Sequence, residues 1–363
     1  MKSLWQAYCL TFKDIVGHSS IFTTLILSVI FYSFFYPTAY QAQQAESLPI
    51  IIVDEEQSTL TANIINQVSQ SPSVDIKAVT ANFSEAKQWV EAKKADGILL
   101  LPANLSHSIH HGENGGIGLY LSAANFLVTK QIGLGLASSI ENSLAEYTER
   151  FNQISAFNPA ISVHQIPLFN PLSGYGSYVF PAVAPLIIHQ TIFLGLSMLI
   201  AVYRERKTSF NLNSFIGMCL AIFSIGCLGC LYLFGFTLWF FDYPRGGNFF
   251  GMLMAVPISI FCIIGLTCLL ASYLDMPERA GHVIVFTSIP LFMLSGVAWP
   301  HVAMPHWMQL LGQALPSTQI VQMFIQLNQM GVSIAIVTTK LCYLLIVGSL
   351  CFFFGYRRLS KQF

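Results

Sequence analysis

Six long apolar stretches run through most of the chain, and one long polar stretch separates the first from the second. The apolar stretches cover residues 21–36, 179–203, 215–241, 249–273, 283–299 and about 332–355. A run of about 20 apolar residues is long enough to cross a hydrocarbon core near 30 Å thick. The pattern therefore predicts a polytopic α-helical membrane protein with six transmembrane helices.

The first apolar stretch lies near the amino terminus, which raises the alternative of a signal peptide. No small-x-small cleavage motif directly follows it, and the leader before it is long. We therefore expect an uncleaved transmembrane helix over residues 19–37. Residues 1–18 carry apolar side chains at helical spacing, with Lys13 and Asp14 on another side, which predicts an amphipathic helix at the membrane interface. Its apolar residues are Leu4, Trp5, Tyr8, Phe12 and Ile15.

The polar stretch over residues 38–178 holds twelve acidic and six basic residues and is too patterned to be a loop. Strands are predicted at residues 49–53, 74–79 and 97–101, with a further candidate at 119–122. Helices are predicted at residues 58–69, from residue 84, and at about 125–157. The alternation of strands and helices indicates a separate α+β domain with a small mixed sheet covered by helices.

The distribution of lysine and arginine predicts the orientation. Nine of these residues fall on one face of the six-helix arrangement, including both terminal segments, whereas the short loops opposite carry only Arg245. Because basic loops stay in the cytoplasm, both termini are expected there and the α+β domain outside. Lys340, near the outer end of the last helix, is expected to snorkel outward, because the membrane segments offer no carboxylate partner.

Composition excludes several classes of protein. Hydrophobic residues make up 54% of the 363 residues and charged residues only 9%, against about 25% charged in soluble domains. Basic and acidic residues both number 17, so no basic excess points to nucleic acid as a partner. The eight cysteines all lie in or beside predicted membrane segments, which leaves no disulfide framework for the α+β domain. Cys227 and Cys230 form a CxxC pair, but inside an apolar helix they are interpreted as packing residues.

Motifs for catalysis or nucleotide binding are missing from the sequence. It contains no GxxxxGK[ST], HExxH or GxSxG pattern, so we expect no catalytic residue and no phosphate-binding loop in this chain. His110 and His111 are adjacent in a predicted turn, and His301 and His306 flank a proline-rich segment. The first two histidines point apart, and no Cys, Asp or Glu lies near the second two in the sequence, so no metal site is predicted.

Residues 291–331 carry the most informative pattern. A helix ends at Ser295 and Gly296, and the segment that follows, residues 300–331, is apolar but broken by prolines. Such short pieces fit a re-entrant or interfacial segment within the five-helix region at residues 179–363. The candidate residues of an external gate here are Ser295, Gly296, Pro300, Met304, Pro305, Trp307 and Pro316.

This order of motifs resembles the carboxy-terminal signature of the ABC type-2 transporter permeases. The resemblance covers nearly the whole chain: an amino-terminal anchor, an outer domain opening with the strand at residues 49–54, a run at residues 96–102, and five further helices. It is similar to the subgroup with a large periplasmic domain. The sequence Phe169-Asn170-Pro171 looks like that subgroup's aromatic-Asn-Pro element, which places Asn170 and Pro171 at the junction between domain and membrane.

The same family carries a cytoplasmic Arg-Glu-x-Gly-Thr motif that couples the permease to its ATPase. The corresponding residues here are Arg204, Glu205, Arg206, Lys207 and Thr208, with Lys207 in place of the glycine. A topology signal alone explains the three basic residues but not Glu205. In the resembled family the amino-terminal amphipathic helix also touches the ATPase subunit.

The resemblance implies the permease subunit of an ATP-driven exporter in a bacterial inner membrane. ATP and Mg²⁺ would be bound by separate ATPase chains, and this chain would hold no cofactor. Because one set of six helices has no internal repeat, a second copy or a paralogous permease is expected to complete the path. Helices rich in phenylalanine and methionine favour amphipathic, drug-like or lipid-like cargo. Membrane lipids and a periplasmic adaptor protein are further candidate partners.

Two other classes stay open from the residues alone. One is a membrane-anchored sensor or scaffold whose outer domain binds a ligand or adaptor, although the predicted cytoplasmic pieces, at most about twenty residues, hold no signalling domain. The other is a membrane-embedded enzyme, which the scarcity of Asp, Glu and His in the apolar stretches disfavours. An adjacent gene for an ATPase would favour the exporter.

Overall fold

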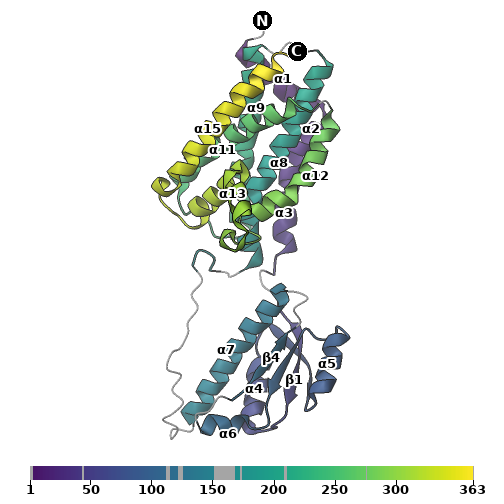
Figure 1. Ribbon diagram of the computed structural model, residues 1–363, viewed down its shortest axis with the longest axis vertical. Coiled ribbons are helices and arrows are strands. Elements are labelled where there is room, and N and C mark those ends of the chain that lie inside the picture. Colours follow the sequence, from purple (N-terminus) through teal and green to yellow (C-terminus); the bar gives the residue numbers. More distant parts are fainter. Residues whose placement is uncertain are drawn as a thin grey trace. The chain divides into compact units, whose positions relative to one another are not determined.

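The computed structural model describes residues 3–42, 45–111, 115–121, 126–150, 168–171, 174–207, 211–274 and 276–362. The chain forms two compact units, coloured along the sequence in Figure 1. We call the unit Ala42–Ile166 the inserted unit, and the unit made of Met1–Gln41 and Pro167–Phe363 the helical unit.

The inserted unit contains a four-stranded mixed sheet with the strand order β2-β1-β3-β4. Strands β1, β2 and β3 pair in parallel, and β4 is antiparallel to β3. The elements are β1 (Leu48–Asp54), α4 (Thr59–Ser69), β2 (Val74–Thr80), α5 (Phe83–Glu91), β3 (Gly97–Leu101), α6 (Leu105–His110), β4 (Gly118–Leu121) and α7 (Phe126–Arg150). The predicted alternation of strands and helices and the small mixed sheet are confirmed. The predicted end of the long helix at residue 157 lies outside the described residues.

Both faces of the central strand β1 are covered, which explains its continuous apolar sequence. Ile50 and Ile52 face a core shared with α4 and α7, whereas Ile51 and Val53 face a smaller core shared with α5. The helices that cover β1 begin at polar capping residues. Ser58 caps α4 in a capping box with Thr61, and the Asn82 side chain accepts from the amide of Ser84 at the start of α5.

The helical unit is built from long helices around a central one. They are α1 (Leu4–Gly17), α2 (Ser19–Phe22), the π-helical η1 (Thr23–Leu27), α3 (Ser28–Ala39), α8 (Tyr175–Glu205), α9 (Leu212–Leu231), the π-helical η2 (Tyr232–Thr237), α10 (Leu238–Phe240), α11 (Phe249–Ala271), α12 (Pro277–Leu294) and α15 (Ile334–Leu359). Between α12 and α15 lie the short η3 (His301–Ala303), α13 (His306–Ala314), α14 (Pro316–Phe324) and the π-helical η4 (Ile325–Gln329). The carboxy-terminal ends of α1, α8 and α15 meet at one end of the unit, which we call the basic end (Figure 1).

Within the described residues, five helices are long and apolar enough to cross a membrane. They are Ser19–Ala39, Tyr175–Glu205, Leu212–Phe240, Phe249–Ala271 and Ile334–Leu359. The chain is therefore a multi-pass helical membrane protein. The sixth predicted crossing corresponds to α12, whose 18 residues begin with a polar turn containing Glu278 and Arg279. That it crosses the membrane stays a prediction.

The bounds of α12 differ from the predicted range of 283–299. It begins earlier, at Pro277, because proline suits the first position of a helix and Glu278 interacts favourably with the helix dipole. It ends earlier, at Leu294, because Gly296 adopts a φ of +82° that a helix does not continue through. The Ser295-Gly296 helix end that the sequence indicated is confirmed.

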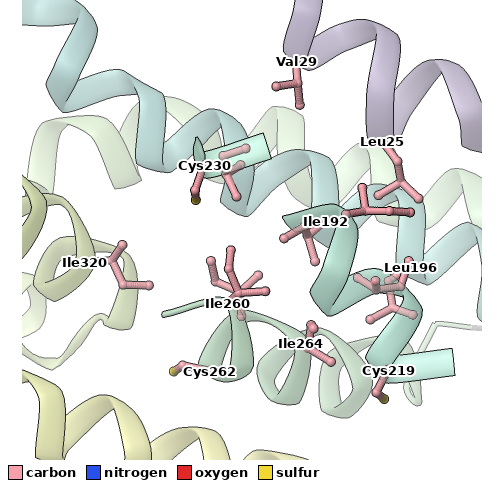
Figure 2. Packing of buried hydrophobic residues seen from close by; sticks show 14 of the residues in the cluster. Leu25, Val29, Ile192, Leu196, Cys219, Cys230, Ile260, Cys262, Ile264 and Ile320 are labelled. Carbon is pink, nitrogen blue, oxygen red and sulfur yellow. The ribbon is translucent and has the colours of Figure 1, made fainter. Parts of the chain in front are cut away.

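We call Ser19–Ala39, which consists of α2, η1 and α3, the first long helix. Helix α8 forms the centre of the helical core, with most of its residues buried between the first long helix, α9, α11, α12 and α14. Figure 2 shows Leu25 beside Ile192 and Leu196 of α8, and a Cβ on the intervening Gly195 would lie only 2.4 Å from Leu25 Cγ. Small residues of this kind let membrane helices approach closely. Cys219, Cys230 and Cys262 lie among these apolar side chains, and Cys227 packs against them, all as free thiols.

Candidate functional site

The residues proposed for coupling lie where α8 ends, at the basic end of the helical unit. Arg204 Nη1 donates to the carbonyl of Leu274 at 2.6 Å, and its Nη2 donates to Gln362 Oε1 at 2.9 Å. Arg206 Nη1 binds Asp14 Oδ1 at 2.8 Å, and its Nη2 lies 3.1 Å from His18 Nε2. The two arginines therefore join the end of α8 to α1 and to the ends of α11 and α15.

Asp14 lies on the buried side of α1, which corrects the assignment of this residue to the side of Lys13. The buried residues of α1 are Ala7, Thr11, Asp14 and Ile15, whereas Lys13 is exposed. Trp5, assigned to the apolar face, is 69% exposed. Asp14 is buried because Arg206, from a distant part of the chain, binds its carboxylate, and hydrophobic periodicity alone does not reveal such a partner.

Helix α1 packs closely against α9. A Cβ on Gly217 of α9 would lie 2.6 Å from the Ala7 Cβ, so only glycine allows this approach. The Tyr8 hydroxyl lies 3.2 Å from Ser224 Oγ of α9, and Thr11 Oγ1 lies 3.2 Å from the Tyr203 hydroxyl of α8. The amphipathic helix is thus fixed to two long helices of the helical unit.

Glu205 and Lys207 are exposed, as is Arg206, whereas Arg204 is half-buried. No hydrogen bond or ion pair is found for Glu205 among the described residues. Lys207 follows the last turn of α8 with a φ of +47°, a left-handed conformation usually taken by glycine after a helix. This backbone geometry matches the position at which the resembled motif has its glycine. Thr208, the last residue of the predicted set, lies outside the described residues.

Asn170 shapes the start of α8. Its Nδ2 donates to the carbonyl of Gly174 at 3.0 Å, and its Oδ1 accepts from the Ser177 hydroxyl at 2.8 Å. Gln329 Nε2 donates to the Ser177 carbonyl at 3.3 Å, which joins this turn to the end of η4. Pro171 is exposed beside it. That Asn170 and Pro171 mark a junction between domain and membrane stays a prediction.

Part of the predicted gate set forms one packed cluster. Ser295 is fully buried, and its carbonyl accepts from Gln322 Nε2 of α14 at 2.6 Å. The carbonyl of Leu294 accepts from Thr318 Oγ1 of the same helix at 3.3 Å. The Tyr178 hydroxyl of α8 donates to the carbonyl of Val297 at 2.7 Å. The end of α12 is thereby bound to both α14 and α8.

His301 lies at the centre of this turn, a placement that the sequence analysis missed. A Cβ on Gly296 would lie 2.3 Å from the His301 ring, and a Cβ on Gly312 of α13 would lie 3.2 Å from it. The ring therefore fills the space between two glycines. The only signal in the sequence was a glycine on each side of the histidine. This pattern does not predict where the histidine ring lies unless the fold is known.

The other predicted gate residues do not share one site. Met304 is buried and Pro316 begins α14, but Pro300 and Pro305 are exposed and Trp307 is 65% exposed. Lys340 is engaged within the chain, because its Nζ donates to Gln326 Oε1 of η4 at 2.7 Å. No group of three possible metal ligands occurs among the residues that the structure describes.

A cavity of about 520 Å³ lies between the first long helix, α8 and α12, and we call it the three-helix groove. The first long helix and the residue that follows it line the groove with a hydroxyl at every fourth position. These residues are Thr24, Ser28, Tyr32, Tyr36 and Tyr40, with Thr23 beside them. Helix α8 adds Tyr175, Gln190 and Thr191, and α12 adds Ser288. The remaining lining residues are apolar, and none of the lining residues is charged.

The volume of the three-helix groove lies within the range of sites for drug-sized molecules, about 300–1,000 Å³. Sequence analysis did not single it out, although the spacing of hydroxyls along residues 24–40 was a visible signal. Each pair of neighbouring hydroxyls in this series lies on the same side of the helix. The spacing does not reveal which helices stand opposite.

Comparisons with known proteins give one consistent result. Residues 18–357 match the family model described as ABC-2 family transporter protein. A chain of Escherichia coli strain K12 called "Probable multidrug ABC transporter permease YbhR" is 19% identical over 95% of this chain and 94% of its own length. "Inner membrane transport permease YhhJ" of the same strain is 22% identical over 96% of this chain and 94% of its own length.

Proposed function

The chain belongs to the ABC-2 family of transporters, and from this premise we propose that it is the permease subunit of an ATP-driven exporter. The observation that carries the proposal is the family match over residues 18–357, which includes the long helices and the inserted unit together. The family identifies the membrane subunit of an ABC transporter and implies an ABC ATPase as partner. Export as the direction, the dimer and the class of cargo are our proposals.

ATP hydrolysis belongs, in this proposal, to the separate ATPase chains. The sequence has no GxxxxGK[ST] pattern, so the loop that cradles nucleotide phosphates would come from the partner. ATP and Mg²⁺ would bind there, and this chain would contribute only motion. Transport then requires that contacts between the permease and the ATPase differ between nucleotide states.

We place the contact with the ATPase at the basic end, which faces the cytoplasm if both termini lie there. Arg204 and Arg206 are engaged within the permease, so they serve to position the turn after α8. Glu205 is the exposed acid of that turn and is available to a basic groove on the ATPase. A force applied to Glu205 would reach α1, α11 and α15 through the two arginines.

The three-helix groove is the candidate cargo site. Hydroxyls and aliphatic side chains both line it, with the apolar ones supplied by α8 and α12, and this mixed lining suits amphipathic molecules in an inner membrane. Helix α12 leaves several large apolar side chains exposed beside it, Val285, Phe286 and Ile289 among them. A second copy, or a paralogous permease, packed against this face would close the groove into a path.

The inserted unit lies in the periplasm in this proposal, and a periplasmic adaptor protein is a candidate partner for it. The cluster of Ser295, Gly296 and His301 would then lie at the outer end of the path, with α12 as the sixth crossing. At 18 residues, α12 is about 27 Å long, close to the thickness of a hydrocarbon core.

Charge reversal at Glu205 tests the coupling contact. We expect Glu205→Lys to insert normally but to bind the ATPase more weakly, or to lose the stimulation of ATP hydrolysis by cargo. Glu205→Ala is expected to be milder, because exposed ion pairs contribute only about 0–1 kcal/mol. The measurements are co-purification with the ATPase and ATP turnover in lipid vesicles.

Glu141→Lys, an exposed acid on α7 of the inserted unit, is the matched control and should behave as wild type. Wild-type ATPase binding and turnover in Glu205→Lys would exclude this turn as the coupling element. Failure of the unaltered chain to bind any ABC ATPase would favour the sensor or scaffold instead.

A further inference from the structure

Four tyrosines form one end of the three-helix groove. Tyr32 and Tyr36 occupy successive turns of α3, Tyr40 directly follows that helix, and Tyr175 stands at the start of α8. The ring centroids of Tyr32 and Tyr36 are 6.0 Å apart, and those of Tyr40 and Tyr175 are 5.0 Å apart. The four tyrosines therefore form an aromatic wall made of two ring pairs at this end of the groove.

Apolar side chains of α8 and α12 supply a second kind of surface in the groove. Val179 and Val183 of α8 and Ile284, Ile289 and Phe292 of α12 line it with apolar surface. The groove therefore offers an aromatic wall with hydroxyls to one part of a ligand and aliphatic surface to another part. A molecule with a polar head and an apolar body is complementary to this arrangement.

The electrostatic potential of the tyrosine rings determines whether a cationic or an anionic head group of the ligand is favoured. The face of an aromatic ring carries negative potential, so it attracts cations and repels anions. Among the residues that the structure describes, no lysine, arginine or histidine lines the groove to compensate an anion, and no carboxylate lines it to hold a small cation in place. Only a large, weakly hydrated cation gains from ring faces without having to lose a tightly held water shell.

We propose that the tyrosine end of the three-helix groove binds the head of amphipathic organic cations, such as quaternary ammonium or phosphonium compounds. This inference rests on the proposed export function, because it names the cargo class of the same site. The apolar body of the cation lies against Ile284, Ile289 and Phe292, and its charged centre lies over the rings of Tyr32 and Tyr36.

A pair of probes with the same shape and opposite charge tests the proposal. Full-length protein in lipid nanodiscs, without ATPase or nucleotide, is titrated with tetraphenylphosphonium and with tetraphenylborate, and empty nanodiscs supply the background. We expect saturable binding of the phosphonium cation and none of the borate anion. Equal binding of the two ions, or no binding of the cation, would overturn the proposal, and neither measurement needs a variant.

Variants then locate the cation. Tyr36→Leu removes a ring face and should weaken phosphonium binding by about 2- to 30-fold, whereas Tyr36→Phe keeps the ring and should stay within about twofold of wild type. Phe35→Leu is the matched control, since Phe35 is on the same helix, does not line the groove and is 54% exposed. Losses that are equal in Tyr36→Phe and Tyr36→Leu, or equal in Phe35→Leu, would contradict binding by the ring face.

The result separates this inference from the proposed function. A chain that binds its ATPase and exports uncharged compounds, but does not bind the phosphonium cation, would refute the cation site and leave the exporter intact. A chain that binds the cation but no ATPase would support the cation site and refute the exporter.

Discussion

Gly296 and Gly246 share a backbone conformation but have different surroundings. Their φ angles are +82° and +85°, a region in which any other residue is strained. A Cβ on Gly246 would meet nothing within 4 Å, whereas a Cβ on Gly296 would lie 2.3 Å from the His301 ring. Substituting each glycine therefore distinguishes the free-energy cost of a positive φ from the cost of a steric clash with His301.

Gly246→Ala is expected to lower the free energy of unfolding by about 1–2 kcal/mol, from the backbone alone. Gly296→Ala should lower it by about 1–3 kcal/mol more, because the ring of His301 cannot move without disturbing Gly312. Thermal unfolding of the purified variants in detergent measures the difference. Adding His301→Ala should remove much of the extra cost of Gly296→Ala, and equal losses in the two glycine variants would contradict the packing.

Some features of single residues could be predicted from the sequence and others could not. The helix end at Ser295-Gly296 was predictable, because serine and glycine signal helix termination locally. The partner of that turn, His301, was not, because a lone histidine has no distinctive pattern until three segments are packed around it. The same holds for Arg204, whose bonds to Leu274 and Gln362 span much of the chain.

Helix α1 is the element whose attachment differs most from expectation. Its position and amphipathic character were predicted, but its buried side includes Asp14, held by Arg206. The Asp14 side chain is 11% exposed, and one of its carboxylate oxygens has no hydrogen-bond partner among the described residues. Removing Arg206 therefore leaves a nearly buried charge without its partner.

A double-mutant cycle tests this attachment. Arg206→Ala should destabilise the protein more than the double variant Asp14→Ala with Arg206→Ala, because the double variant leaves no unpaired carboxylate. We expect a coupling energy of about 1–3 kcal/mol from unfolding of the purified proteins. Hydrogen exchange over Leu4–Gly17 should rise in both single variants. Additive effects would show that the contact does not hold α1.

Helix α12 shows why element boundaries were less predictable than element existence. The apolar run began at residue 283, but Pro277 and Glu278 start the helix earlier. Capping and helix-dipole effects act on polar residues that a hydropathy pattern leaves out. Conversely, the strands of the inserted unit agreed closely with their predicted ranges, since turns and prolines bound them on both sides.

At the scale of the whole molecule, the inserted unit has the features of an independent domain. It has its own sheet and two apolar clusters, and residues 42–166 contain no cysteine. A fragment of residues 46–159 should therefore be soluble, show an α+β circular dichroism spectrum and melt cooperatively with or without reductant. An unfolded or wholly helical product would contradict this.

Membrane topology is the other property of the whole molecule that can be measured. Val302→Cys and Leu310→Cys, at exposed positions of the segment after α12, should react with an impermeant thiol reagent from outside intact cells. The background must lack the eight native cysteines. Lys361→Cys, at the exposed carboxy-terminal end, should react only after permeabilisation. The opposite pattern would reverse the predicted orientation.

The sequence by itself determined the long membrane helices, the alternating elements of the inserted unit and the family. A helix that crosses a bilayer needs a continuous apolar run whatever packs around it, and a buried parallel strand must be apolar on both faces. The local sequence is therefore sufficient to predict these features. Tertiary structure alone decided which side of α1 is buried, what the arginines of α8 bind, and that hydroxyls along residues 24–40 face α8 and α12. These contacts join residues far apart in the chain, and local hydrophobicity carries no information about which distant residue will be the partner.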